Sequence, residues 1–131
     1  MIIDTSALLA ILRDEPDAAA YAGVIEGAAA RRISAANFLE AAIVIDASRD
    51  PIASRRFDEF LKVAEIVMEP VTEEHAWLGR EAYRDFSKGS GHPAQLNFGD
   101  CFAYALAKAT GETLLFKGED FTRTDIAPAM G

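Results

Sequence analysis

The chain opens with MIIDTSALLAIL, residues 1–12, a stretch that contains the unit from which the fold is expected to be built. Met1–Ile3 is a short apolar run, typical of a buried strand. Thr5–Arg13 carries apolar residues three and four positions apart, which predicts a helix with one apolar face. Asp4 stands between the two segments. A strand, an acid and a helix thus follow one another within thirteen residues.

The order of strand and helix recurs along the chain. Further strands are predicted at Arg31–Ala35, Glu65–Val71 and Thr113–Phe116, with a short extra one at Asp125–Ala127. Helices are predicted up to about Gly27, from about Phe38 to Ser48, from Pro51 onward, from the cap Thr72 to about Ser87, and from about Phe98 to Ala109. This alternation predicts an α/β fold with a central, mostly parallel sheet flanked by helices. In such sheets, sites form outside the carboxyl ends of the strands.

Length and composition limit the class of protein. With 131 residues, half of them hydrophobic, the chain is predicted to form a single domain, residues 1–131, around a real core. The single Cys101 excludes an internal disulfide, and neither a basic leader nor a membrane-length apolar run is evident, so a cytoplasmic location is predicted. A formal charge of −8 argues against a general nucleic-acid binder, which is usually basic, unless the acids cluster for a purpose.

Acids stand at the predicted strand ends. Asp4 ends the first strand, and Asp120 follows the last confident one. Glu40 and Asp100 each lie in the predicted first turn of a helix. Such a set of carboxylates predicts a site for Mg²⁺ or Mn²⁺, which prefer oxygen ligands. Without a cation the carboxylates would repel one another and raise each other's pKa.

The tetrapeptides NFLE, residues 37–40, and NFGD, residues 97–100, allow a second interpretation. Asn37 and Asn97 could each cap a helix, with the acid three residues later completing a capping box. The acid would also gain from the helix dipole. Capping and metal binding therefore both remain open for Glu40 and Asp100.

Four segments resemble the conserved blocks of PIN-domain ribonucleases, most closely the VapC toxins: MIIDTSALLAIL, ISAANFLEAAIVI, LNFGDCFAYALAKATG and LLFKGEDFTRTDI. The resemblance implies a three-layer PIN-like sandwich and a Mg²⁺- or Mn²⁺-dependent endoribonuclease. Such an enzyme is the toxin of a type II toxin–antitoxin pair, hydrolyses RNA with a metal-activated water and is restrained by a cognate VapB-type antitoxin. A homodimer, or a larger toxin–antitoxin assembly, is also implied.

The same resemblance assigns roles to residues. The family's acidic set, catalytic and metal-binding, falls on Asp4, Glu40, Asp100 and Asp120. Ser6 matches the hydroxyl that supports the site. Glu119 departs from the pattern, because many relatives have Asn or Asp at that place, and it adds a second carboxylate directly before Asp120.

Other residues have a structural and a functional interpretation. Ser6 could cap the first helix, and Asn97 could cap its helix while touching substrate. Arg80, Arg84 and Lys88 recur every four residues, which is typical of a solvated face but would also suit phosphate binding. Cys101 is predicted to be a core residue.

Two predicted helices have strongly apolar faces, at Ala18–Ile25 and at Ile52–Leu61. In the second, the residues expected to face inward are Ile52, Phe57, Phe60 and Leu61. These faces exceed what one sheet contact needs, and the family resemblance suggests dimer and antitoxin contacts there.

Two other functions compete with the nuclease. A receiver-like signalling domain would also have an acid pocket and Mg²⁺, but it needs a phosphoacceptor after a central strand, and Asp46 falls within a helical pattern. A non-catalytic PIN-like scaffold would have no reason to retain acids at all four positions.

Overall fold

The computed structural model describes residues 1–87 and 89–130, so Lys88, the third cation of the predicted row, lies outside the described residues. Within them the chain builds a four-stranded sheet in the order β3-β2-β1-β4, with every neighbouring pair parallel. The strands are β1 (Ile2–Ile3), β2 (Arg32–Ser34), β3 (Val67–Glu69) and β4 (Leu114–Leu115). The predicted parallel sheet is confirmed, although each strand is shorter than its apolar run.

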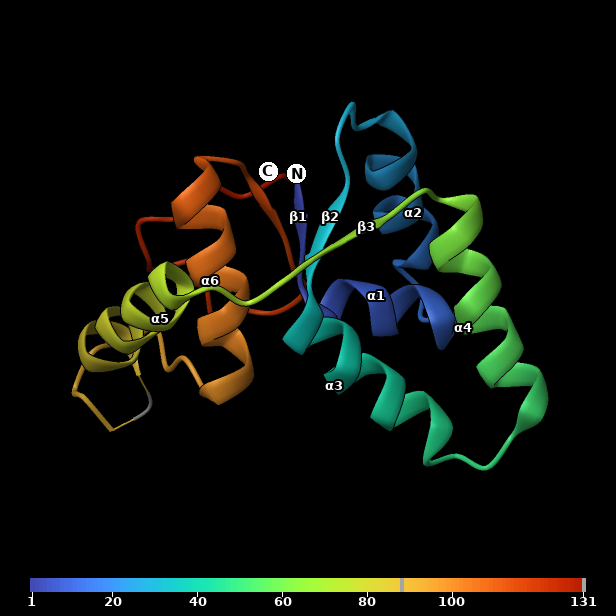
Figure 1. Cartoon of the computed structure of the whole chain (residues 1–131), viewed down its shortest axis with the longest axis horizontal. Helices are drawn as coiled ribbons and strands as arrows, with labels where there is room; N and C mark the ends of the chain where they lie inside the picture. The colour runs from blue at the N-terminus through green and yellow to red at the C-terminus, as the bar shows by residue number, and fades with distance from the viewer. Residues whose placement is uncertain (88, 131) are drawn as a thin grey trace.

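Helices cover both sides of the sheet (Figure 1). One side carries α1 (Thr5–Leu12), α2 (Ala18–Gly27), α3 (Ala35–Asp46) and α4 (Pro51–Val63). The other side carries α5 (Glu73–Phe86) and α6 (Phe98–Thr110). The α/β sandwich predicted from the alternation of elements is confirmed. No helix within the described residues is long and apolar enough to cross a membrane.

Successive residues of the central strand β1 and of its neighbour β4, at the edge of the sheet, point to opposite faces and build two cores. Ile3 and Leu115 belong to the core formed with α1 to α4. Ile2 and Leu114 belong to the core formed with α5 and α6. All four side chains are fully buried. Burial on both faces explains why these strands are continuous apolar runs and why they hold the acids that follow them in fixed places.

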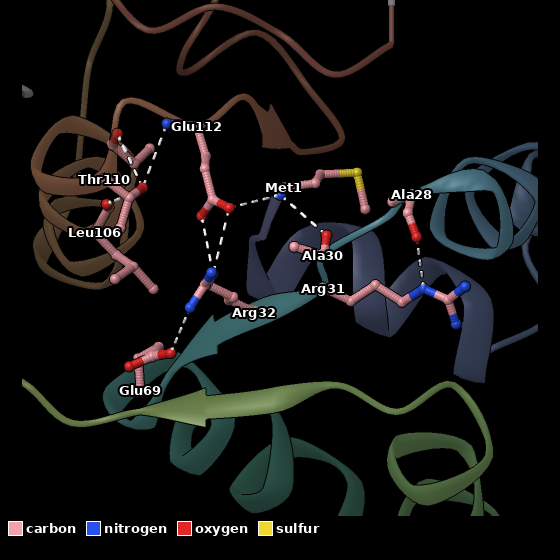
Figure 2. A network of polar contacts seen from close by, with 10 residues as sticks. Met1, Ala28, Ala30, Arg31, Arg32, Glu69, Leu106, Thr110 and Glu112 are labelled. Atoms are coloured by element: carbon pink, nitrogen blue, oxygen red, sulfur yellow. Dashed lines mark hydrogen bonds and ion pairs between the residues drawn. The ribbon is translucent and has the colours of Figure 1, made fainter.

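A polar network around Met1 and Arg32 links the strands (Figure 2). The ammonium group of Met1 donates to the carbonyl of Ala30 at 3.0 Å and lies 3.3 Å from a carboxylate oxygen of Glu112. Arg32 pairs with Glu69 at 3.0 Å and with Glu112 at 3.2 Å. Each acid of this network has a cation beside it, so charges are balanced within the network.

The start of α3 differs from the prediction in a way that changes the site. The helix begins at Ala35, three residues before Phe38, because Ser34 at the end of β2 accepts the N–H of Ala36 and caps it. Asn37 is therefore a fully buried residue inside the first turn. The predicted role of Asn37 as the residue that caps this helix is wrong.

The packing of α4 was predicted only in part. Phe57 is buried, and Phe60 and Leu61 pack against the same core, as expected. The prediction for Ile52 is wrong, since 64% of it is exposed. Phe57 comes five positions after Ile52, which places the two side chains about 140° apart around the helix axis.

The extra strand predicted at Asp125–Ala127 is not formed within the described residues. This segment ends in a single parallel bridge between Leu114 and Pro128. Asp125 accepts hydrogen bonds from the Tyr104 hydroxyl at 2.7 Å and from Lys108 at 2.6 Å. These side-chain bonds anchor the segment to α6, and a proline lacks the N–H that would extend the ladder.

Candidate active site

Asp4 lies where β1 ends and α1 begins. Its Oδ2 accepts the backbone N–H of Ser6 at 3.0 Å and the Ser6 hydroxyl at 2.5 Å. The Ser6 oxygen in turn accepts the N–H of Lys117, which follows β4, at 2.9 Å. The cap of α1 is thus Asp4 and not Ser6. Ser6 instead supports the Asp4 carboxylate and joins the ends of two neighbouring strands.

Glu40 projects from the second turn of α3. Its Oε1 accepts the hydroxyl of Thr5 at 2.5 Å and lies 3.4 Å from the side-chain nitrogen of Asn37. The interpretation of Glu40 as the acid of a capping box is wrong, because the helix starts earlier and Ser34 caps it. Glu40 is held instead by the residue that follows Asp4, which ties two of the predicted acids to the same short segment.

Asp100 does complete a capping box at the start of α6. The N–H of Asn97 donates to Oδ2 of Asp100 at 3.0 Å, and the N–H of Asp100 donates to Oδ1 of Asn97 at 2.9 Å. The capping interpretation of Asn97 and Asp100 is therefore confirmed. The box uses one of the two carboxylate oxygens, so it is compatible with a second role for Asp100.

The two similar tetrapeptides pack against each other. The side-chain nitrogen of Asn37 donates to the carbonyl oxygen of Gly99 at 3.0 Å. A Cβ on Gly99 would overlap the carboxylate of Glu40, so the glycine leaves room for that acid. The sequence reasoning overlooked Gly99 and Thr5. For Gly99 a signal was present, because a glycine is a poor helix former and this one directly precedes an acid in a first turn.

Burial changes the acidity of two of these carboxyl groups. Desolvation raises the pKa of Asp4 from 3.8 to about 6, and the nearby charge of Glu40 adds to the rise, although bonds from Ser6 oppose it. Desolvation also raises the pKa of Asp100 to about 8, with the carboxylates of Asp4 and Asp120 adding to it. The four predicted acids therefore belong to one electrostatic neighbourhood.

The two acids after β4 are placed differently. Asp120 is half-buried, and its carboxylate is close enough to Asp100 to add to the rise in the pKa of Asp100. Glu119 is exposed, and its carbonyl accepts the Thr122 hydroxyl at 2.7 Å. Of the two, Asp120 is the acid that this structure brings to the others.

Comparison with known proteins agrees with this arrangement. The family model described as the PIN domain matches residues 1–127. The chain belongs to the PIN-domain family. The resemblance stated from the four sequence blocks is thereby confirmed, and the fold described above is a PIN fold.

Relatives and a solved structure narrow the group. This PIN domain is 58% identical to the ribonuclease VapC28 of Mycobacterium tuberculosis over 130 residues, which cover 99% of this chain and 98% of the relative. It is 48% identical to VapC30 of the same organism, covering 97% and 96%. A crystal structure of Mycobacterium tuberculosis VapC20, described as a sarcin-ricin loop cleaving toxin, superposes with a TM-score of 0.71. At 15% identity, covering 96% and 95%, it supports the fold alone.

The donor chemistry of the PIN-domain site suits a hard divalent cation. The four acids offer carboxylate oxygens, and burial, to which neighbouring carboxylates add, raises the pKa of Asp4 and Asp100. Within residues 1–87 and 89–130, no three acid, histidine or cysteine side chains lie close enough to hold one ion. Glu40 and Asp100 are instead held by hydrogen bonds to other residues. Their carboxylate oxygens are suitable ligands for a divalent cation, and the side chains would have to move closer together to bind one.

The two described cations of the predicted row have different surroundings. Arg84 pairs with the neighbouring Asp85 at 3.3 Å on an exposed surface, as a solvated helix face would. Arg80 lies 5.7 Å from the ring centre of Trp77. It also lines an apolar hollow of about 350 Å³ between α5 and α6, together with His75, Tyr83, Phe98 and Phe102. Phe98, which lines this hollow, stands two residues before Asp100 in the sequence.

Cys101 is a core residue, as predicted. It is buried against α5, and desolvation raises the pKa of its thiol to about 11. A thiol with such a pKa stays protonated at neutral pH, so it is a poor nucleophile.

Proposed function

We propose that this PIN domain is a metal-dependent endoribonuclease, the toxin of a type II toxin–antitoxin pair, whose cation is held by Asp4, Glu40, Asp100 and Asp120. The observation that carries the proposal is the set of desolvated carboxyl groups at the carboxyl edge of the sheet, in a chain that shares 58% identity with a VapC ribonuclease. The donor set favours Mg²⁺ or Mn²⁺.

Each residue has a distinct part in this function. A bound divalent cation supplies a reactive water at neutral pH and neutralises charge on a phosphodiester. Asp4, Glu40 and Asp100 would place that cation between three elements of the fold. Asp120 would be a further ligand or would orient the water. Ser6 and Asn97 would support Asp4 and Asp100 through the hydrogen bonds described above.

The experiment is a cleavage assay with the purified chain. RNA carrying the sarcin-ricin loop is a suitable first substrate, because VapC20 is described as cleaving it. We expect cleavage with Mg²⁺ or Mn²⁺ and its loss in EDTA. Undiminished cleavage in EDTA would exclude the metal mechanism. A chain with Asp4→Asn serves as the control for contaminating nucleases.

The partners of the proposed toxin are a VapB-type antitoxin, RNA and a second copy of the chain. A hollow of about 330 Å³ lies between α2 and α4, where it is lined by Ile25, Phe60 and Val63. It lies between the two helices whose apolar faces we predicted to carry dimer and antitoxin contacts. A second apolar hollow, of about 410 Å³, is bordered by the exposed side chains of Leu39 and Ile43.

We propose Arg80 before Arg84 as a contact for RNA. Arg80 lines the aromatic hollow beside the start of α6, where an unpaired base could stack on Phe98, which is 77% exposed. Arg84 has a neighbouring acid as its partner. Glu119 is kept as an accessory acid whose part is secondary to that of Asp120.

The structure disfavours the receiver-like alternative. Asp46 is the last residue of α3, is exposed and accepts the hydroxyl of Ser54 at 2.7 Å. A phosphoacceptor would instead follow a central strand, in the acid pocket. Asp4, which does follow the central strand β1, belongs to the proposed nuclease site.

A further inference from the structure

Glu40 is held by three residues from three different helices. Thr5, in α1, donates its hydroxyl to Oε1 at 2.5 Å. Asn37, one turn earlier in α3, directs its side-chain nitrogen both to Glu40, at 3.4 Å, and to the carbonyl of Gly99 in α6, at 3.0 Å. The carboxylate itself lies where a side chain on Gly99 would be.

The glycine at position 99 is explained by space and not by backbone conformation. The positive-φ glycines of the described chain are Gly89, Gly91, Gly111 and Gly118, so Gly99 has a conformation that any residue can adopt. Alanine would favour a helical first turn more than glycine does. A Cβ there would lie 2.9 Å from Cδ of Glu40 and would overlap Oε2. Glycine at this position therefore makes room for the Glu40 carboxylate, although it lowers the helix propensity of the first turn of α6.

Asn37 supports the same interpretation. Its side chain is fully buried, and its Oδ1 has no hydrogen-bond partner within the described residues. A buried amide with an unsatisfied oxygen is unfavourable, so a structural role alone does not explain it well. Its nitrogen, however, links α3 to α6 at the point where Glu40 approaches Gly99.

We propose that Thr5, Asn37 and Gly99 are positioning residues that fix the carboxylate of Glu40 between α1 and α6. A glutamate side chain has several rotamers, and a site that acts on a reacting group needs its members held to about half an ångström. What Glu40 then does rests on the proposed function. The positioning itself is independent of any cation and can be tested without one.

The first test is a double-mutant cycle of thermal melts in EDTA. In the wild-type background, Gly99→Ala should displace Glu40 from Thr5 and Asn37 and lower the Tm. In a Glu40→Ala background the methyl group enters vacated space, and the same substitution should raise the Tm. Gly23→Ala in α2 is the matched control, because a Cβ there meets nothing within 4 Å, and it should raise the Tm equally in both backgrounds.

The cycle decides the proposal whatever the stability of the variants. Should Gly99→Ala fail to fold in the wild type but fold with Glu40→Ala, the coupling is confirmed in its strongest form. Equal Tm shifts for Gly99→Ala in the two backgrounds would overturn the proposal.

The second test measures Mn²⁺ binding by calorimetry on the purified chain. Thr5→Val removes the hydroxyl at nearly constant shape and should weaken binding tenfold or more. Thr5→Ser keeps the hydroxyl and should stay within about twofold of wild type. Equal affinities for the valine and serine variants would overturn the role of Thr5. A wild-type chain that binds no Mn²⁺ would refute the metal in the proposed function, while the melts in EDTA would still decide whether Glu40 is positioned.

Discussion

At the scale of single residues, the two similar tetrapeptides have different functions in the fold. Asp100 caps its own helix, whereas Glu40 reaches across to Thr5 and Gly99. Three identical or similar residues out of four are therefore no guide to a shared role, because the helix starts at the first residue after Asn97 but two residues before Asn37. The substitutions that separate charge from hydrogen bonding follow from this difference.

Glu40→Gln should leave the fold nearly unchanged and abolish most of the activity. The amide oxygen can still accept the Thr5 hydroxyl, so we expect a loss of at most about 1 kcal/mol of stability. The charge offered to the cation is lost, so RNA cleavage should fall by two orders of magnitude or more. Thermal melts and cleavage rates on the same preparation test this. Wild-type rates in a folded variant would remove Glu40 from the site.

Asp100→Asn should change how stability depends on pH. The pKa of Asp100 in the folded, metal-free chain is raised from 3.8 to about 8, so its contribution is complete below about pH 4 and is lost as the pH rises through 8. Metal-free wild type should thus become less stable between pH 6 and 9. The variant should be at least as stable as wild type at pH 9, and its profile should be flatter.

Urea unfolding in EDTA at pH 6 and pH 9 measures both profiles. Ionisation of Asp4 also lowers the stability of both proteins as the pH rises, but at lower pH. The pKa of Asp4 is raised from 3.8 to about 6, a shift worth about 3 kcal/mol. Parallel profiles for the two proteins between pH 6 and 9 would show that Asp100 ionises normally.

At the scale of elements, the helix starts carry the site. Asp4 caps α1, Ser34 caps α3 and leads to Glu40, and Asn97 caps α6 and holds Asp100. α1 and α3 directly follow the strands β1 and β2, and the first turn of α6 lies beside α3, where Asn37 donates to Gly99. A cap at the site should therefore differ in its effects from a cap elsewhere.

Asn97→Ala and Thr72→Ala compare two such caps. Both residues accept an N–H in the first turn of their helix, α6 and α5 respectively. Each variant should lose about 1 kcal/mol of stability. Only Asn97→Ala should also slow cleavage, by tenfold or more, since the backbone N–H of Asp100 loses its acceptor and the first turn that carries Asp100 is less well fixed. An equal effect of both variants on the cleavage rate would show that Asn97 acts on stability alone.

At the scale of the whole molecule, two polar clusters on the sheet differ in charge balance. Near the start of β2, Arg32 lies between Glu69, the last residue of β3, and Glu112, which precedes β4 (Figure 2). At the carboxyl end, burial raises the pKa of Asp4 and Asp100, and the neighbouring carboxylates add to the rise. The cluster at the carboxyl end is therefore the place where a cation would stabilise the native chain.

Mg²⁺ should raise the stability of the whole chain, and more so at high pH. Ligand linkage predicts about 2.7 kcal/mol at a free concentration of 100 times Kd. Protons compete for Asp100 below pH 8, so the rise in Tm with Mg²⁺ should be larger at pH 8.5 than at pH 6. The baseline Tm at each pH is measured on samples that are free of Ca²⁺ and treated with EDTA. A Tm that does not respond to Mg²⁺ at either pH would contradict a metal site.

Sequence patterns were sufficient for the features that depend on neighbours along the chain. The alternation of apolar runs and helical periods predicts the parallel sheet, and the position of Asp4 directly after the first apolar run predicts that this acid lies at the carboxyl edge of the sheet. The box of Asn97 and Asp100 was also predictable, since its partners are three residues apart. These are local relations, and local relations are what spacing in a sequence encodes.

Tertiary structure alone decided how Glu40 is used. Its contact with Thr5 joins residues 35 positions apart, and the bond from Asn37 to Gly99 joins residues 62 positions apart. The bond from Lys117 to Ser6 spans 111 positions. Such contacts exist only once β1, β2 and β4 align in parallel and bring their carboxyl ends together, because the free energy of packing two cores, not any short motif, sets where the helices that follow the strands meet.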